Sequence, residues 1–189
     1  LVLFTGRPLV LNWEQANVPA ILNVWFGGSE AAYAIGDVLF GRVNPSGKLT
    51  MSFPQNVGQI PLYYAHKNTG RPLHDGKWFE KFRSNYLDVT NEPLYPFGFG
   101  LSYTTFAYSD ISLSQTSMNM QGVLTASVNV TNTGAFPGGE VVQLYIRDLV
   151  GSTTRPVKEL KGFQKVKLAP GEEKAVTLTI DKKALSFFD

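Results

Sequence analysis

The chain has 189 residues, enough for one large or two small domains, and 43% of them are aliphatic or aromatic, which supplies a sizeable core. The net charge is +2, with Lys and Arg spread along the chain, which argues against nucleic acid or a membrane surface as the main partner. No run of about 20 apolar residues is present, so no segment is predicted to span a bilayer. The absence of Cys excludes disulfides and thiolate metal sites.

The N-terminal part of the chain predicts a layered α/β domain. Three short apolar runs are typical of buried strands: Leu1–Phe4, Leu9–Leu11 and Ala20–Trp25. A helix is predicted next, because apolar residues recur at helical spacing at Ala31, Ala34, Ile35, Val38 and Leu39. Ser29 is expected to cap this helix and Gly41 to end it. A strand, a Gly turn and a capped helix form half of a βαβ unit.

The segment Gly41–Lys48 superficially resembles a phosphate-binding loop. Five residues separate its two glycines instead of four, and Leu49 stands where a Ser or Thr would be needed for magnesium. The phosphate-loop interpretation therefore fails. Asn44–Gly47 is predicted to form a turn, and Lys48–Phe53 is predicted to be a strand that Pro54 closes.

Residues Gln55–Pro93 show no clear periodicity. Such a long irregular stretch is uncommon in a compact domain and is often functional, so one interpretation is that part of it lines a ligand cleft. The alternative is a linker that packs across two domains. Arg71 and Arg83 are the candidates for substrate binding, whereas His66 and His74 are too isolated to be proposed as metal ligands.

The segment Leu94–Phe106, called the connector below, carries five aromatic rings and two glycines in thirteen positions. Rings at this density are costly to leave in water, so the connector is predicted to be a buried joint between two domains. An exposed platform for a sugar or a partner is the alternative. A nucleotide loop is not supported, because no strand–Gly-x-Gly-x-x-Gly–helix pattern surrounds Gly98 and Gly100.

After the connector the sequence alternates as β-strands do. Alternation in Val123–Thr131 places Leu124, Ala126, Val128 and Val130 on one face. Further strands are predicted within Glu140–Arg147 and around Val176, Leu178 and Ile180, and Val157–Leu168 is predicted to be a less regular extended stretch. Several such strands with polar outer faces predict an antiparallel β-sandwich.

No catalytic group is apparent from the pattern. Glu14, Glu30, Glu80 and Glu92 are scattered, and none has a carboxylate partner at an informative spacing. We therefore assign no catalytic residue, metal ligand or cofactor site from the residue pattern.

The order of several motifs resembles the glycoside hydrolase family 3 β-glucosidases, and above all their periplasmic branch. The motifs cover nearly the whole chain: Gly6–Pro8, Ile21–Glu30, Ala34–Gly41, Asn44–Leu49, Ile60–Tyr64, Asn68–Pro72, the connector, Thr131–Gly134, Val142–Tyr145, Arg155–Phe163 and Leu168–Glu172.

The resemblance implies a parent with a TIM-like barrel, an α/β sandwich domain and a fibronectin type III-like domain. This chain would hold the C-terminal half of the second domain (1–64), a linker loop with the connector (65–106), and an incomplete third domain that lacks its final strands (107–189). Both ends are expected to be cut. The implied parent is a periplasmic or secreted bacterial enzyme that removes terminal β-D-glucosyl residues from gluco-oligosaccharides or aryl glucosides with retention.

In the family, an aspartate of the barrel is the nucleophile and a glutamate is the acid/base, and neither motif is found in this sequence. The chain alone is therefore expected to be inactive and to depend on the missing barrel. The alternatives are a carbohydrate-binding module and a structural two-domain module.

Overall fold

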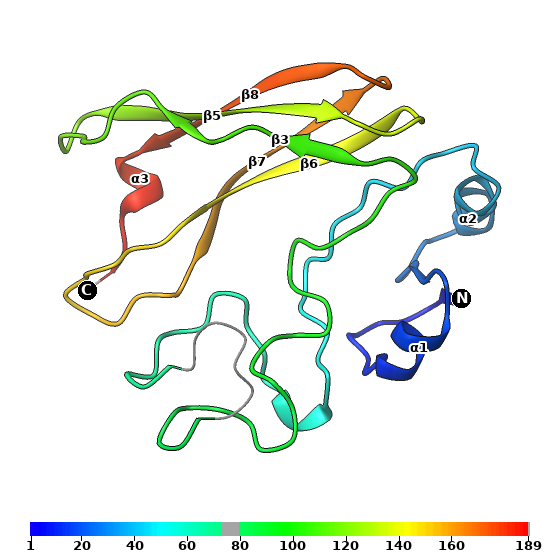
Figure 1. Cartoon of the computed structure of the whole chain (residues 1–189), viewed down its shortest axis with the longest axis horizontal. Helices are drawn as coiled ribbons and strands as arrows, with labels where there is room; N and C mark the ends of the chain where they lie inside the picture. The colour runs from blue at the N-terminus through cyan, green and yellow to red at the C-terminus, as the bar shows by residue number, and fades with distance from the viewer. Residues whose placement is uncertain (73–79, 189) are drawn as a thin grey trace. The chain divides into compact units, whose positions relative to one another are not determined.

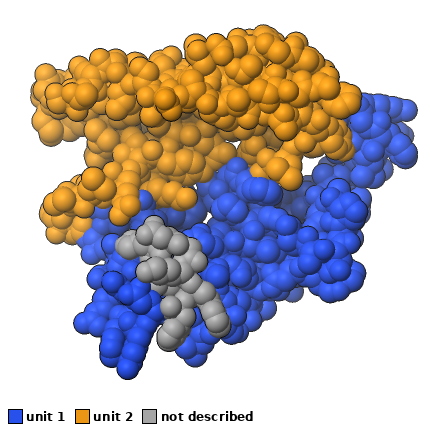
Figure 2. All heavy atoms as spheres, viewed as in Figure 1, with its two compact units in different colours: residues 1–43, 49–99, 154–157 blue, residues 44–48, 100–153, 158–189 orange. Residues whose placement is uncertain are grey.

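The computed structural model describes residues 1–72 and 80–188. The chain divides into two compact units (Figure 2). Unit 1 comprises Leu1–Val43, Leu49–Phe99 and Thr154–Val157, and unit 2 comprises Asn44–Lys48, Gly100–Thr153 and Lys158–Asp189. The chain therefore crosses from one unit to the other several times, and each unit contains a short segment flanked in sequence by residues of the other.

Unit 1 begins with a small parallel sheet. Strand β1 (Val2–Leu3) pairs with β2 (Leu22–Asn23), and the connection between them contains helix α1 (Asn12–Asn17). Parallel strands need such a crossover, because a tight hairpin would make them antiparallel. Helix α2 (Ala31–Leu39) follows β2, so this part has the predicted α/β layout (Figure 1).

Two local predictions near the helices of unit 1 are wrong. Leu9–Leu11 is not a strand but leads into helix α1, with only Leu11 buried. The residue before α2 is Glu30 rather than Ser29, and neither side chain caps the helix. Short apolar runs do not distinguish a strand from a helix entry, which explains the first error. The predicted end of α2 is confirmed, because Gly41 has a φ of 73° just past the helix.

Lys48–Phe53 is not a regular strand, although it is extended at its two ends. Its partner is the connector: the Leu49 amide donates to the Phe99 carbonyl over 2.7 Å, and Phe53 bridges to Tyr95 in antiparallel fashion. The bend at Thr50–Met51 interrupts the ladder between these two contacts. The preceding Asn44–Gly47 is not a turn either, because its Asn44 side chain bonds distant residues rather than its own backbone.

Unit 2 is the predicted antiparallel sandwich (Figure 1). One sheet is built on β5 (Val123–Asn132), which pairs with β8 (Glu173–Asp181) and also with two short strands, β3 (Phe106–Tyr108) and β4 (Ser112–Leu113). The second sheet is the pair β6 (Gly138–Ile146) and β7 (Glu159–Leu168), with a register shift at Leu144/Tyr145. A short helix, α3 (Lys182–Leu185), follows β8.

The core of unit 2 lies between these two sheets. One cluster of buried side chains contains Val130, Val142, Val166, Leu168 and Val176, and a second contains Ala126, Leu144 and Ile180. These residues include most of the inward rows predicted from the alternation. The period of two is reliable here because successive side chains of a strand point to opposite faces.

Residues Gln55–Pro93 contain only the 3₁₀ turn Val57–Gln59 as a regular element among the positions that the structure describes. This agrees with the predicted long loop. Among the described helices, none is long and apolar enough to cross a membrane.

Candidate functional site

The candidate site is the long loop of unit 1, because the sequence placed its substrate-binding candidates there. Arg71 and Arg83 are both exposed. The Ser84 amide donates to the Arg71 carbonyl over 2.9 Å, which brings the two arginine-bearing segments together at the backbone. Arg83 Nε lies 3.4 Å from Glu80 Oε1, in a pair whose side chains are both more than two-fifths exposed. His74 lies outside the described residues.

A buried glutamine, Gln59, closes the neck of this loop. It is 1% exposed, and its Oε1 accepts from the Gln55 amide over 2.6 Å. Its Nε2 donates to the Thr90 carbonyl over 2.9 Å, and its own carbonyl accepts from the Tyr86 hydroxyl over 2.8 Å. These bonds connect Gln55 and Gln59, at the start of the loop, to Tyr86 and Thr90, about thirty residues later in sequence. They therefore hold the two ends of the loop close together.

Gln59 was missed by the sequence analysis, although a signal for it exists. Asn56 and Gln59 have the spacing of a capping box, and both reciprocal side-chain bonds of that motif are present at the 3₁₀ turn. The spacing identifies the turn. The contacts to Thr90 and Tyr86 depend on the tertiary fold.

A second part of the loop, His66–Lys67, is held separately. The Val157 amide donates to the His66 carbonyl over 2.9 Å, and Lys67 forms a bridge with Pro156. Residues Thr154–Val157, which belong to unit 1, lie between β6 and β7 in sequence. The loop is thus fixed at two places, at Gln59 and at His66–Lys67.

Several rings of the connector pack against other aromatic side chains. Tyr95 stacks on Phe99 at a centroid distance of 5.4 Å, and Phe97 stacks on Tyr64 at 4.1 Å. Phe53, which is 2% exposed, lies edge-on between Trp25 and Tyr95. Burial, and then the negative charge of Glu14, raise the pKa of Tyr95, whose hydroxyl donates to Gln15.

The predicted burial of the connector is met only in part, because none of its five rings is fully buried. Tyr95, Phe97, Phe99 and Phe106 are half-buried, whereas Tyr103 is 47% exposed. An open aromatic platform in the connector is not what the structure contains.

The carboxylates of the described residues are almost all at least partly exposed to solvent. The one buried carboxylate among them is Glu140, and it is held by Lys48 at 3.0 Å and by the Tyr108 hydroxyl at 2.8 Å. Both partners of Glu140 belong to unit 2, as Glu140 itself does. No cluster of three His, Asp or Glu side chains suited to a metal occurs in residues 1–72 and 80–188.

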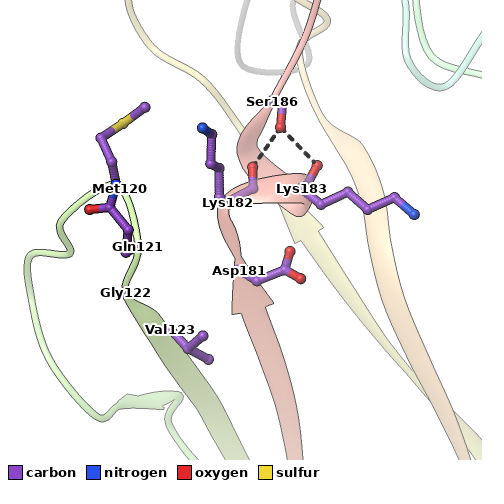
Figure 3. A pocket seen from close by; sticks show the side chains of 8 residues that line it. All are labelled: Met120, Gln121, Gly122, Val123, Asp181, Lys182, Lys183 and Ser186. Carbon is purple, nitrogen blue, oxygen red and sulfur yellow. Dashed lines mark hydrogen bonds between the residues drawn. The ribbon is translucent and has the colours of Figure 1, made fainter.

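A surface pocket of about 480 Å³ lies in unit 2, where the loop before β5 faces helix α3 (Figure 3). Met120, Gln121, Lys182, Lys183 and Ser186 line it together with Gly122, Val123 and Asp181. Ser186 Oγ donates to the Lys182 carbonyl over 2.7 Å, and Asp181 accepts from the Ala184 amide over 2.8 Å. Both polar groups therefore form hydrogen bonds within helix α3 and its flanking residues. Arg71 and Arg83 do not line this pocket.

Comparison with known proteins finds two domain families along the chain. Residues 1–103 match the glycosyl hydrolase family 3 C-terminal domain, and residues 140–189 match the fibronectin type III-like domain. The periplasmic β-glucosidase of Salmonella typhimurium is 56% identical over 189 residues, which are all of this chain and 25% of that protein. A β-xylosidase of Formosa agariphila is 49% identical over 95% of this chain and 24% of its own length.

Solved structures agree with these matches. The β-glucosidase of Listeria innocua in complex with isofagomine superposes with a TM-score of 0.93 at 46% identity, over 100% of this chain and 26% of the enzyme. A mutant of that enzyme in complex with laminaribiose gives a TM-score of 0.91 at 45% identity, over the same shares. The chain spans about a quarter of the length of the relatives that it matches. It belongs to glycosyl hydrolase family 3, of whose members it corresponds to a C-terminal part.

Proposed function

We propose that this chain is the C-terminal part of an exo-acting, retaining β-glucosidase and that it is inactive by itself. The observation that carries the proposal is the match of the whole chain to a quarter of β-glucosidases from several organisms. Retention requires two carboxylates about 5 Å apart. The one buried carboxylate of the described residues, Glu140, is engaged by Lys48, so the reacting pair is assigned to the rest of the parent enzyme, including its barrel.

We further propose that the loop held by Gln59 is what this chain contributes near the sugar, with Arg71 and Arg83 as its substrate-binding candidates. Both guanidinium groups can donate several hydrogen bonds to sugar hydroxyls. The domain limits proposed from the sequence remain 1–64, 65–106 and 107–189. A periplasmic or secreted location is proposed from the periplasmic relative.

The proposal is tested with two preparations, the 189-residue chain and the parent enzyme. The chain alone should not cleave an aryl β-glucoside, because loss of a covalent nucleophile costs many orders of magnitude in rate. The parent should cleave it with retention of configuration. Activity of the purified chain would overturn the proposal.

A β-xyloside is the second candidate substrate, because one relative at 49% identity is a β-xylosidase. Parallel assays of the parent with aryl β-glucoside and aryl β-xyloside separate the two. Calorimetric titration of the 189-residue chain with cellobiose tests the alternative of a carbohydrate-binding module, and heat from stoichiometric binding would favour that alternative.

A further inference from the structure

Residues Asn44–Lys48 lie between segments of unit 1 in sequence but pack within unit 2. We call them the strap. Its Lys48 Nζ is 3.0 Å from Glu140 Oε2 and donates to the Gly100 carbonyl over 2.8 Å. The side chains of Lys48 and Glu140 are only 18% and 11% exposed, so this is not an ordinary surface ion pair.

The other end of the strap is fixed by Asn44. Its Nδ2 donates to the Pro137 carbonyl over 2.9 Å, and its Oδ1 accepts from the Tyr103 amide over 2.8 Å. One side chain thus joins the segment just before β6 to the segment just before β3. These partners are 93 and 59 residues away in sequence.

Between its two ends, the strap lies too close to the sandwich to allow extra atoms. A Cβ on Gly100 would lie 2.2 Å from the Gly47 carbonyl oxygen, and a Cβ on Gly139 would lie 3.3 Å from Ser46 Cβ. Glycine at position 100 therefore lets the strap and the sandwich make direct backbone contact, and glycine at position 139 leaves room for the Ser46 side chain.

The buried Glu140 shows why the strap matters to the sandwich. A carboxylate removed from water without a compensating charge is strongly unfavourable, and the cation at salt-bridge distance from Glu140 is Lys48 of the strap. The Tyr108 hydroxyl supplies one hydrogen bond but no charge. The sandwich sequence from residue 100 onward therefore contains a buried acid whose counter-ion is encoded 92 residues earlier.

We propose that the strap is an integral part of the sandwich and that the Lys48–Glu140 ion pair holds it there. Unit 2 is then fully stable only when Lys48, which follows the α/β segment in sequence, is paired with Glu140. The device makes the two domains of the chain interdependent. The proposal concerns the stability of unit 2 and the position of the strap, and it does not depend on whether the parent is a β-glucosidase.

The test compares Lys48→Met with Lys174→Met in the full 189-residue chain. Both changes remove an ammonium 3.0 Å from a carboxylate, but the Lys174–Glu172 pair is 46% and 38% exposed. We expect Lys48→Met to lower Tm by about 10 °C, because it leaves a buried charge unpaired. Lys174→Met should lower it by less than about 2 °C. Equal shifts for the two variants would overturn the proposal.

Hydrogen exchange separates release of the strap from general destabilisation. The Tyr103 amide is protected by Asn44, whereas the Val157 amide is protected by His66 in unit 1. In Lys48→Met, exchange should accelerate more at Tyr103 than at Val157. Equal acceleration at both amides would show that the variant only destabilises the whole chain, and the lock would be rejected.

Two further variants keep the test informative if Lys48→Met does not fold. Asn44→Ala removes the two hydrogen bonds at the other end of the strap without unpairing a charge, and it should likewise accelerate exchange at Tyr103 more than at Val157. The double variant Lys48→Met/Glu140→Gln should recover at least half of the lost Tm or restore folding, since the unpaired carboxylate is gone. Failure of both expectations would refute the lock.

Discussion

At the scale of single residues, the most constrained side chains are polar groups with several partners. Gln59 uses its side-chain oxygen, its side-chain nitrogen and its own carbonyl to hold the neck of the long loop. Asn132, which is fully buried, accepts from the Thr104 hydroxyl over 2.6 Å and donates to the Leu168 carbonyl over 3.1 Å. Buried polar groups of this kind are costly to leave without partners, so replacing one of them should lower the stability of the fold strongly.

The first prediction concerns Gln59. Gln59→Ala should lower the free energy of unfolding by about 2–3 kcal/mol, because the change leaves the Gln55 amide and the Thr90 carbonyl without their hydrogen-bond partner. Gln121→Ala, at an exposed position in unit 2, should change it by less than about 0.5 kcal/mol. Denaturant titration of both variants checks this. Similar values for the two would mean that Gln59 does not hold the loop.

The second prediction concerns the pH dependence of stability near Tyr108. Burial raises the pKa of Tyr108 above its usual range, and the hydrogen bond to Glu140 and the charge of Glu140 raise it further. The folded state therefore binds the phenolic proton more tightly than the unfolded state does. The stability from this group is complete below the unfolded pKa of about 10 and is lost as the pH rises above it.

The measurement is denaturant unfolding between about pH 8 and about pH 11. Tyr108→Phe should make the decline above about pH 10 shallower. Tyr63→Phe, at a residue that is 65% exposed, serves as the matched control and should leave the slope as in the parent chain. An unchanged slope in Tyr108→Phe would contradict the prediction.

At the scale of elements, the two units are stabilised differently. The strands of unit 2 enclose two clusters of buried aliphatic side chains. In unit 1, neither α1 nor α2 contains a buried residue, and its fully buried side chains include Phe53 and Gln59. The described part of unit 1 is therefore held by ring stacking and by side-chain hydrogen bonds in irregular segments.

The third prediction uses two glycines in different elements. Gly36 lies inside α2 with nothing within 4 Å of an added Cβ, so Gly36→Ala should stabilise the helix by about 0.5–1 kcal/mol. Gly100→Ala would place its Cβ against the Gly47 carbonyl and should destabilise by roughly 1–3 kcal/mol. Thermal unfolding of the two variants should give shifts of opposite sign. A neutral Gly100→Ala would show that the strap and the connector do not pack as described.

At the scale of the whole molecule, a large amount of apolar surface remains in water. Large side chains of unit 1 are strongly exposed at Trp13 (68%), Phe26 (87%), Tyr33 (76%) and Phe40 (84%). The predicted apolar stripe of α2 is also poorly covered, because Ala34 and Leu39 are exposed. Each such side chain forgoes roughly 1.5–3 kcal/mol relative to full burial, while a domain has only about 5–15 kcal/mol of net stability.

The fourth prediction follows from this exposure. The 189-residue chain should unfold below about 60 °C and should associate as its concentration rises, because apolar surface drives contact between copies. Thermal unfolding followed together with light scattering measures both properties. The substitution Phe40→Ser should reduce association more than Leu87→Ser, which changes an equally exposed side chain in the irregular loop. A monomer with a sharp transition well above about 60 °C would refute the prediction.

The sequence by itself determined the long strands of the sandwich and the family, but not its two short strands β3 and β4. The inward rows of β5, β6 and β8 could be predicted because alternation is a local property: each side chain faces the side opposite to its neighbour. Helix α2 was found from its spacing, and the end of that helix from Gly41. The order of short motifs along the chain identified the family, since those motifs are contiguous in sequence. The candidate residues Arg71 and Arg83 were reached only as members of a long irregular loop, and their role in sugar binding stays a prediction.

The tertiary structure alone decided how the irregular segments are held. Asn44–Gly47 was predicted to be a turn because proline and glycine favour turns, but Asn44 bonds to Pro137 and Tyr103 instead. Lys48 meets Glu140, and Gln59 meets Thr90, through contacts that no local pattern encodes. Such pairings form when the chain closes loops of about 30 to 90 residues, and their free energy depends on burial that exists only in the folded state. The physical reason is the sequence separation of the interacting residues. Periodicity and propensity depend on a few neighbouring residues, whereas the strap and the Gln59 contacts join residues that are far apart in sequence.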